Sequence, residues 1–254
     1  MKVVILAGGF GTRLSEETVI KPKPMVEIGD EPILIHLMKY YSSYGFNEFV
    51  LALGYKSDYI KEYLFNYMNF QNNLLLDFQN KKITQLENKN LPWKIQLIET
   101  GKETNTGGRL KKLQNYLDGE QFLFTYGDGL SNVNLSKLLQ HHKQSKSIVT
   151  LTGVKAPPKF GNLKIVNKKV IEFSEKGSSV SEWINGGFMV MENKIFDYIS
   201  SSTDSLEFDT LEKIAKEKKL SCYKHKGFWQ CMDSLKDKTI LEDIWKSKKA
   251  PWKK

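Results

Sequence analysis

Cysteine is scarce in this chain of 254 residues, and long apolar runs are missing. The two cysteines, Cys222 and Cys231, are too few for a disulfide framework and lack the spacing of a metal-binding motif, which suits a reducing compartment. No apolar run approaches the ~20 residues that a membrane helix needs. The opening "MKVVILAGG" is also too short for the apolar region of a signal peptide. We therefore expect a cytoplasmic protein with no membrane partner.

Acidic residues are fewer than basic ones, 29 against 38, and the net charge is +9 at pH 7. The lysines are nevertheless spread along the chain, without zinc-finger spacing, an RRM signature or an arginine-rich arm. Dispersed positive charge also suits an enzyme that handles polyanions such as nucleoside triphosphates. We expect no nucleic-acid partner and place most of the lysines on the solvated surface.

Arginine is the scarcest basic residue, since only two of the 38 lysines and arginines are arginine. Arg13 stands in "LAGGFGTRL" (6–14) and Arg109 in "TGGRL" (106–110), each beside glycines. Arginine presents a planar fork of donors that matches phosphate or a base edge, whereas lysine does not. Backbone N–H groups of glycines can approach an anion closely. The two segments together predict a nucleotide site.

Strands and helices alternate along the first 150 residues. The patterns predict strands at 2–7, 48–54, 74–78, 93–100, 121–129 and 147–154, and helices at 32–44, 57–68, 108–117 and 134–145. A hairpin at 162–173, a strand at 183–192 and two helices around 220–233 follow. This order predicts one α/β domain over 1–254 with a parallel or mixed sheet and a β-rich distal half. About twenty residues after the first strand are expected to form a functional loop.

The glycine loop after the first strand fits neither of two familiar phosphate-binding motifs. A Walker A string is absent, and Leu14 stands where the dinucleotide fingerprint has its third glycine. A dehydrogenase is therefore the alternative from another class. A simple tight turn would explain the glycines but not Arg13, Lys21 and Lys23 close behind them. Three cations near one glycine loop indicate a triphosphate or a pyrophosphate.

"LAGGFGTRL" together with "KPKPM" resembles the signature of sugar-nucleotide pyrophosphorylases, which join a nucleoside triphosphate to a sugar 1-phosphate. The resemblance continues through "YGDG" (126–129), "NGGF" (185–188) and "FWQCMD" (228–233). "GTRLSEET", "TGGRLKKL" and "KAPWK" are most similar to the bacterial glucose-1-phosphate cytidylyltransferases. The resemblance implies a Rossmann-like nucleotidyltransferase fold: a mixed, mostly parallel sheet flanked by helices. Residues 1–130 would then mainly bind nucleotide, and residues 131–254 the sugar phosphate.

Activity and partners follow from the same resemblance. It implies transfer of a cytidylyl group from CTP to α-D-glucose 1-phosphate, giving CDP-glucose and pyrophosphate, with Mg²⁺ as cofactor. It also implies a homo-oligomer, a trimer or hexamer, whose product feeds lipopolysaccharide O-antigen biosynthesis. UTP, dTTP or another sugar phosphate are alternative substrates. A nucleotide-binding regulatory protein without turnover is the alternative outside enzymes.

The resemblance further assigns roles to single residues. Arg13, Lys23 and Asp128 form the catalytic set, and Asp128 and Asp233 hold the metal. From its position alone, Asp128 could equally be a turn residue and Asp233 the N-cap of the last helix. The nucleotide-binding residues are Leu6, Ala7, Gly8, Gly9, Phe10, Gly11, Thr12, Arg13, Lys23, Thr104, Arg109 and Gly127. The sugar phosphate is assigned to Gly161, Glu175, Lys176, Asn185 and Gly186.

Two positions bear on substrate choice. Gly177 stands where the family commonly has proline, which leaves the identity of the sugar open. Arg109 offers only donors, which suits the O2 and N3 acceptors of cytosine and not the N3–H of uracil. The alternative is that Arg109 covers the surface of its own helix, although the helix dipole disfavours a cation there. His141 and His142 lie on a lysine-rich helix and are expected to be exposed.

Overall fold

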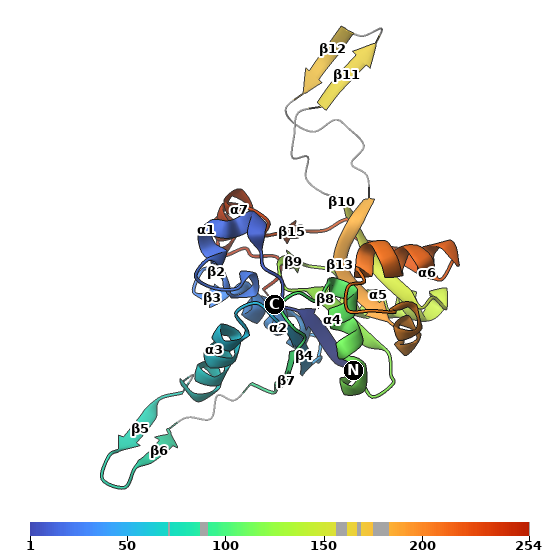
Figure 1. The fold of residues 1–254 in the computed structure, drawn as a ribbon. Coiled ribbons are helices and arrows are strands. Elements are labelled where there is room, and N and C mark those ends of the chain that lie inside the picture. The colour runs from blue at the N-terminus through green and yellow to red at the C-terminus, as the bar shows by residue number, and fades with distance from the viewer. Residues whose placement is uncertain (71, 87–90, 156–161, 167–168, 175–182, 254) are drawn as a thin grey trace.

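A seven-stranded mixed sheet forms the centre of the computed structural model (Figure 1). The structure describes residues 1–70, 72–86, 91–155, 162–166, 169–174 and 183–253. The strands of the sheet, in spatial order, are β14 (Leu220–Lys224), β10 (Val149–Lys155), β13 (Trp183–Met191), β8 (Phe122–Tyr126), β1 (Lys2–Leu6), β4 (Glu48–Leu53) and β7 (Lys94–Glu99). Only β13 runs antiparallel to its neighbours, so the mixed, mostly parallel sheet expected from the sequence is confirmed.

The sheet is covered on both faces, which is why its central strands are apolar throughout. Side chains alternate along β1, so Val3 and Ile5 enter one core and Val4 and Leu6 the other. The first core lies under α2 (Ile33–Ser42), α3 (Ser57–Phe70), α5 (Leu135–Ser145) and α7 (Leu235–Lys246). The second lies under α4 (Thr106–Lys112), α6 (Glu212–Lys216), the 3₁₀-helix Asn193–Tyr198 and the π-helix Leu206–Leu211.

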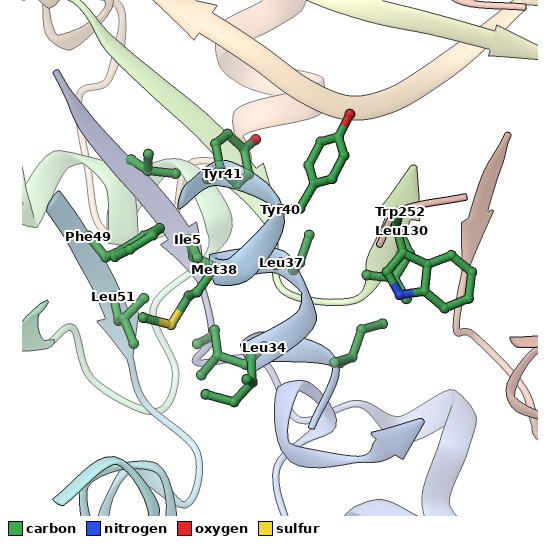
Figure 2. Packing of buried hydrophobic residues seen from close by; sticks show 14 of the residues in the cluster. Ile5, Leu34, Leu37, Met38, Tyr40, Tyr41, Phe49, Leu51, Leu130 and Trp252 are labelled. Atoms are coloured by element: carbon green, nitrogen blue, oxygen red, sulfur yellow. The ribbon is translucent and has the colours of Figure 1, made fainter. Parts of the chain in front are cut away.

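Helix α2 is buried in the first core along most of its length. Its Met38 points toward Ile5 and Leu51, and its Leu37 lies on the side of the helix toward Leu130 (Figure 2). The expected helix is present, but Pro32 is its N-cap and not its first residue, and the helix ends at Ser42, before Gly45. Trp252, near the C-terminus, is only 2% exposed and closes the same core.

Four two-stranded ribbons accompany the sheet. They pair β2 (Glu27–Ile28) with β3 (Glu31–Pro32), β5 (Leu74–Asp77) with β6 (Lys82–Gln85), β9 (Gly129–Ser131) with β15 (Trp229–Cys231), and β11 (Asn162–Val166) with β12 (Lys169–Ser174). The ribbons β5–β6 and β11–β12 project away from the body (Figure 1). The hairpin expected at 162–173 is thereby confirmed.

Several local expectations are wrong. The segment after β1 is not a plain loop, because it contains the 3₁₀-helices Thr12–Leu14 and Lys23–Met25 and the short helix α1 (Ser15–Thr18). The predicted helix 108–117 begins at Thr106, where Asn105 caps it, and gives way to a 3₁₀-turn at Gln114–Tyr116. Strands β6, β14 and β15 were not expected, since they are short and none of them is a continuous apolar run. Within the described part of the chain, no helix has the length and apolarity needed to span a membrane.

His142 is buried and not exposed, which also contradicts the expectation from its lysine-rich helix. Its Nδ1 lies 2.8 Å from Thr150 Oγ1, and its Nε2 lies 2.9 Å from Glu192 Oε1. These polar partners on β10 and beyond β13 compensate for the burial of the imidazole. His141 is half-buried beside Ser221.

Candidate active site

Asp128 and Asp233 are brought together by a short antiparallel ribbon at the carboxyl edge of the sheet. Asp128 lies two residues after the end of β8 and directly before β9. Strand β15 pairs with β9 so that Cys231 lies opposite Gly129, and Met232 N donates to Asp128 O at 2.8 Å. The two aspartates therefore meet although they are far apart in sequence.

Lys23 joins the two carboxylates. Its Nζ donates to Asp128 Oδ2 at 2.7 Å and to Asp233 Oδ1 at 2.6 Å. Arg13 NH1 donates to the other oxygen of Asp233, at 2.8 Å. All four predicted metal and catalytic side chains thus form one ion-pair cluster of Arg13, Lys23, Asp128 and Asp233.

The charge on Lys23 is stabilised although the side chain is buried. Burial opposes the ammonium, but the attraction and hydrogen bonds of Asp128 and then Asp233 outweigh it and raise the pKa of Lys23 above its usual value. Arg13 differs, because 74% of its side chain is exposed. One cation of the cluster is therefore held in place, and the other extends into the open site.

Asp233 is not the N-cap of the last helix, contrary to one reading of the sequence. Ser234 caps α7 by accepting from Asp237 N. Asp237 in turn accepts from Asp233 N at 3.1 Å and from Gln230 Nε2 at 2.9 Å. The Asp233 carboxylate is consequently available to the cations of the cluster.

The glycine loop after β1 forms one wall of a pocket of about 300 Å³. The pocket is lined by ten of the predicted site residues, Leu6, Ala7, Gly9, Gly11, Thr12, Arg13, Lys23, Arg109, Gly127 and Asp128. It is also lined by Pro24, Thr106 and Tyr126, which sequence reasoning did not select. Gly11 has φ +66°, and Thr18 Oγ1 donates to its carbonyl oxygen, so helix α1 holds the loop in shape.

Three predicted nucleotide-binding residues lie outside the lining of this pocket. A Cβ on Gly8 would come within 2.4 Å of Arg109 NH1, so this glycine makes room for the guanidinium. Phe10 is 41% exposed and lies against Tyr55. Thr104 Oγ1 donates to Thr100 O at 2.5 Å. These three residues shape the surroundings of the pocket.

Arg109 is 4% exposed, so the alternative that it covers the surface of its helix is wrong. Its NH1 donates to Thr100 Oγ1 at 2.7 Å, to Gly101 O at 2.6 Å and to Leu53 O at 3.3 Å. Its NH2 donates to Lys102 O at 2.9 Å, which leaves one NH2 hydrogen and Nε–H for other acceptors. Burial lowers the pKa of the Arg109 guanidinium. The side chain nevertheless keeps its charge, because the ordinary pKa of arginine is far above neutral pH.

The paired glycines before Arg109 serve close packing. A Cβ on Gly107 would lie 2.7 Å from Asp204 O, and one on Gly108 would lie 2.2 Å from Ser202 O. The backbone bonds Gly108 N to Asp204 O and Asn105 N to Ser202 O hold the two segments together. The start of α4 is therefore fixed against the chain that precedes the π-helix.

A second, larger pocket of about 910 Å³ adjoins the first, and Arg13, Thr106, Tyr126 and Asp128 line both. Asn185 and Gly186, predicted to bind the sugar phosphate, line the larger pocket. Its lining also includes Glu207, Phe208 and Trp229, and Glu207 and Phe208 were not anticipated because no motif marks them. The other predicted sugar-phosphate residues, Gly161, Glu175 and Lys176, lie outside the described residues.

The two carboxylates suit a divalent cation completed by substrate oxygens. Both converge on a single cationic nitrogen, which shows that one small cation can contact both. In the described part of the chain, no group of three or more histidine, cysteine or acidic side chains is arranged to hold a metal ion. Mg²⁺ commonly takes one or two carboxylates together with phosphate oxygens, so the donor set fits a metal that arrives with a nucleotide.

Comparison with known proteins identifies the family of the chain. The model of the family described as "Nucleotidyl transferase" matches residues 2–237. The chain is 43% identical over 254 residues to the glucose-1-phosphate cytidylyltransferase of Salmonella typhi. This alignment covers 100% of this chain and 99% of the relative. The chain is 42% identical, with the same coverage, to the probable glucose-1-phosphate cytidylyltransferase of Bacillus subtilis. The crystal structure of HddC from Yersinia pseudotuberculosis superposes with a TM-score of 0.70 at 26% identity, covering 96% of this chain and 99% of HddC. The chain belongs to the nucleotidyl transferase family.

Proposed function

We propose that this enzyme transfers a cytidylyl group from CTP to α-D-glucose 1-phosphate, giving CDP-glucose and pyrophosphate. Full-length identity of 43% to a curated glucose-1-phosphate cytidylyltransferase supports the choice of substrates. The ion-pair cluster of Arg13, Lys23, Asp128 and Asp233 carries the chemical part of the proposal. It gathers the cations and carboxylates of a phosphoryl-transfer site where two pockets join.

The reaction is an in-line displacement at the α-phosphorus of CTP. A phosphate oxygen of glucose 1-phosphate forms the new bond to this phosphorus, and the bond from the phosphorus to the bridging oxygen of pyrophosphate breaks. Two anions must meet, so the protein acts mainly by positioning and by neutralising charge. The smaller pocket suits the nucleotide, the larger suits the sugar phosphate, and their shared residues Arg13 and Asp128 lie where the phosphorus reacts.

Asp128 and Asp233 would hold Mg²⁺, which when bound stabilises the charge that develops on the phosphate oxygens. Lys23 now occupies the position between these carboxylates, so its ammonium must move away before both can bind a metal ion. Lys23 also lines the smaller pocket, where it can pair with the triphosphate. Arg13 is exposed at the boundary and can follow the leaving pyrophosphate.

Arg109 supports the choice of cytosine. Its guanidinium is fixed by four oxygen acceptors, and the residue lines the smaller pocket. One NH2 hydrogen and Nε–H are not used by these four bonds and could meet a base there. A fixed donor favours a base with acceptors at O2 and N3. Uracil carries a donor, N3–H, at the same position. Two donors would then face each other without an acceptor, which would disfavour the binding of uracil.

A homo-oligomer, a trimer or hexamer, completes the proposal. Apolar side chains on the β5–β6 ribbon are exposed, with Phe78 at 87% and Ile83 at 67%, and an isolated two-stranded ribbon is marginally stable. Helix α3 and the edge strand β7 line an apolar groove of about 870 Å³ beside it. A second copy of the chain would cover this surface. Light scattering should show an oligomer that Phe78→Ser weakens, and a wild-type monomer at micromolar concentration would contradict the assignment.

A direct assay tests the function. Purified protein with Mg²⁺, CTP and glucose 1-phosphate should release pyrophosphate and form CDP-glucose, identified by ³¹P NMR, and omission of the sugar phosphate should abolish both. CTP binding without any turnover would favour a regulatory protein instead. A cytoplasmic location, a role in O-antigen synthesis and the division at residue 130 remain predictions.

A further inference from the structure

Glu207 is a carboxylate beside the active site for which the reaction described above has no use. It lies in the π-helix Leu206–Leu211 and lines the larger pocket. Its Oε2 accepts from Thr106 Oγ1 at 2.7 Å and from Ser205 Oγ at 2.8 Å, and its Oε1 accepts from the Tyr126 hydroxyl. π-Helical turns occur frequently at functional sites, and this one directs an acidic side chain inward.

The partners of Glu207 come from both sides of the reaction centre. Thr106 is the first residue of α4, three residues before Arg109. Tyr126 ends β8, two residues before Asp128. Thr106 and Tyr126 both line the smaller and the larger pocket. Glu207 therefore connects the start of α4, which carries Arg109, to the end of β8, which Asp128 follows.

An acidic side chain is unfavourable here unless it has a specific task, since the site must take two phosphate-bearing anions. Carboxylate is acceptor-only and can receive several hydroxyl donors at once, whereas an amide or hydroxyl would present a donor of its own. The Tyr126 hydroxyl donates to Glu207 Oε1, so the carboxylate gives this hydroxyl a fixed acceptor at the end of β8. The three hydroxyl bonds also spread the negative charge of Glu207 away from the pocket.

We propose that Glu207 is a positioning residue for nucleotidyl transfer, which holds Thr106 and Tyr126 so that the nucleotide pocket and the sugar-phosphate pocket keep one relative orientation. The inference rests on the proposed function, because the orientation matters only if the two pockets exchange a phosphoryl group. Displacement requires attacking and leaving oxygens in line, and small misplacements reduce the rate strongly. Loss of Glu207 should therefore lower kcat more than it changes either KM.

The test replaces Glu207 by glutamine, which keeps the size but turns one acceptor into a donor. We expect kcat to fall at least about tenfold, KM for CTP and glucose 1-phosphate to change less than about threefold, and the melting temperature to stay close to that of wild type. Tyr126→Phe should also lower kcat, and the double variant should be little worse than Glu207→Gln alone, because both remove the same connection. Glu212→Gln, an exposed residue of the following helix α6, is the matched control and should behave as wild type.

Several results would overturn this inference. An unchanged kcat in Glu207→Gln removes the positioning role, as do fully additive effects of the two substitutions. A large rise in the KM for glucose 1-phosphate at constant kcat would make Glu207 a direct sugar ligand. A wild-type enzyme that prefers another nucleoside triphosphate contradicts only the proposed substrate, and the variants are then compared with that nucleotide. A wild type without any transfer activity contradicts both.

Discussion

Replacing Lys23 by alanine should change metal binding and nucleotide binding in opposite directions. In the ligand-free protein the ammonium makes two hydrogen bonds, of 2.7 and 2.6 Å, to the carboxylates that would hold the metal. A divalent cation must displace it, whereas in the Lys23→Ala protein Asp128 loses this cation and Asp233 keeps its bond from Arg13. With nucleotide, the same substitution removes a positive charge from the pocket that we propose for the triphosphate.

The magnitude follows from the two bonds that are broken. A hydrogen bond between charged groups contributes about 1.5–3 kcal/mol, so displacing the ammonium costs about 3 kcal/mol at the lower end of that range. Since about 1.4 kcal/mol corresponds to tenfold, Mn²⁺ alone should bind Lys23→Ala on the order of a hundredfold more tightly than wild type. CTP in the presence of Mg²⁺ should bind the variant more weakly, by about tenfold or more.

Electron paramagnetic resonance of free Mn²⁺ measures the first affinity, and calorimetry with CTP measures the second. Lys21→Ala is the matched control, because Lys21 is a neighbouring lysine that pairs with Glu27 at 3.4 Å and not with the two aspartates. It should leave Mn²⁺ affinity unchanged. Equal Mn²⁺ affinity of wild type and Lys23→Ala would refute the reasoning that the ammonium and the metal share one position.

Other substitutions test the remaining parts of the site. Asp128→Asn and Asp233→Asn should each lower kcat by about a hundredfold or more in a folded protein, since each removes one metal ligand, and near-normal activity would exclude that residue from the metal site. Arg13→Lys should lower kcat/KM by about tenfold or more, because a point charge cannot make two parallel bonds to phosphate, and retention of most activity would contradict this role. Gly108→Ala should lower the melting temperature by about 5 °C or more, because its Cβ would lie 2.2 Å from a backbone oxygen. Gly9→Ala, whose Cβ meets nothing within 4 Å, should not, and equal melting temperatures would refute the packing argument.

Much of the sheet could be predicted because its central strands are buried on both faces. Strands β1, β4 and β8 are nearly continuous apolar runs, and such runs differ clearly from the polar loops around them. Parallel strands also end at one edge, which explains why the glycine loop and Asp128 could be expected to lie together. The short strands β14 and β15 carry no such pattern and form only because partners lie beside them.

The parts of the site that depend on tertiary contacts escaped prediction from residues alone. The position of Asp233 depends on the pairing of β9 with β15, and only the family resemblance indicated it. Glu207 belongs to no motif, and its partner Thr106 is distant in sequence. The environment of Arg109 also differs from the simple expectation, because four backbone and side-chain oxygens hold the guanidinium. Residue type predicted a nucleotide site, but only packing shows how many donors of Arg109 are already used within the protein.

Competition among nucleotides tests the central claim most directly. CTP, UTP, dTTP, ATP and GTP are mixed at equal concentration with Mg²⁺, glucose 1-phosphate and the enzyme, and the sugar nucleotides formed are quantified by mass spectrometry. Unpaired polar groups in the base pocket cost about 1–3 kcal/mol, so CDP-glucose should exceed UDP-glucose by roughly ten- to a hundredfold. Arg109→Ala should narrow this margin. Predominance of UDP-glucose or dTDP-glucose with the wild-type protein would contradict the cytidylyltransferase assignment.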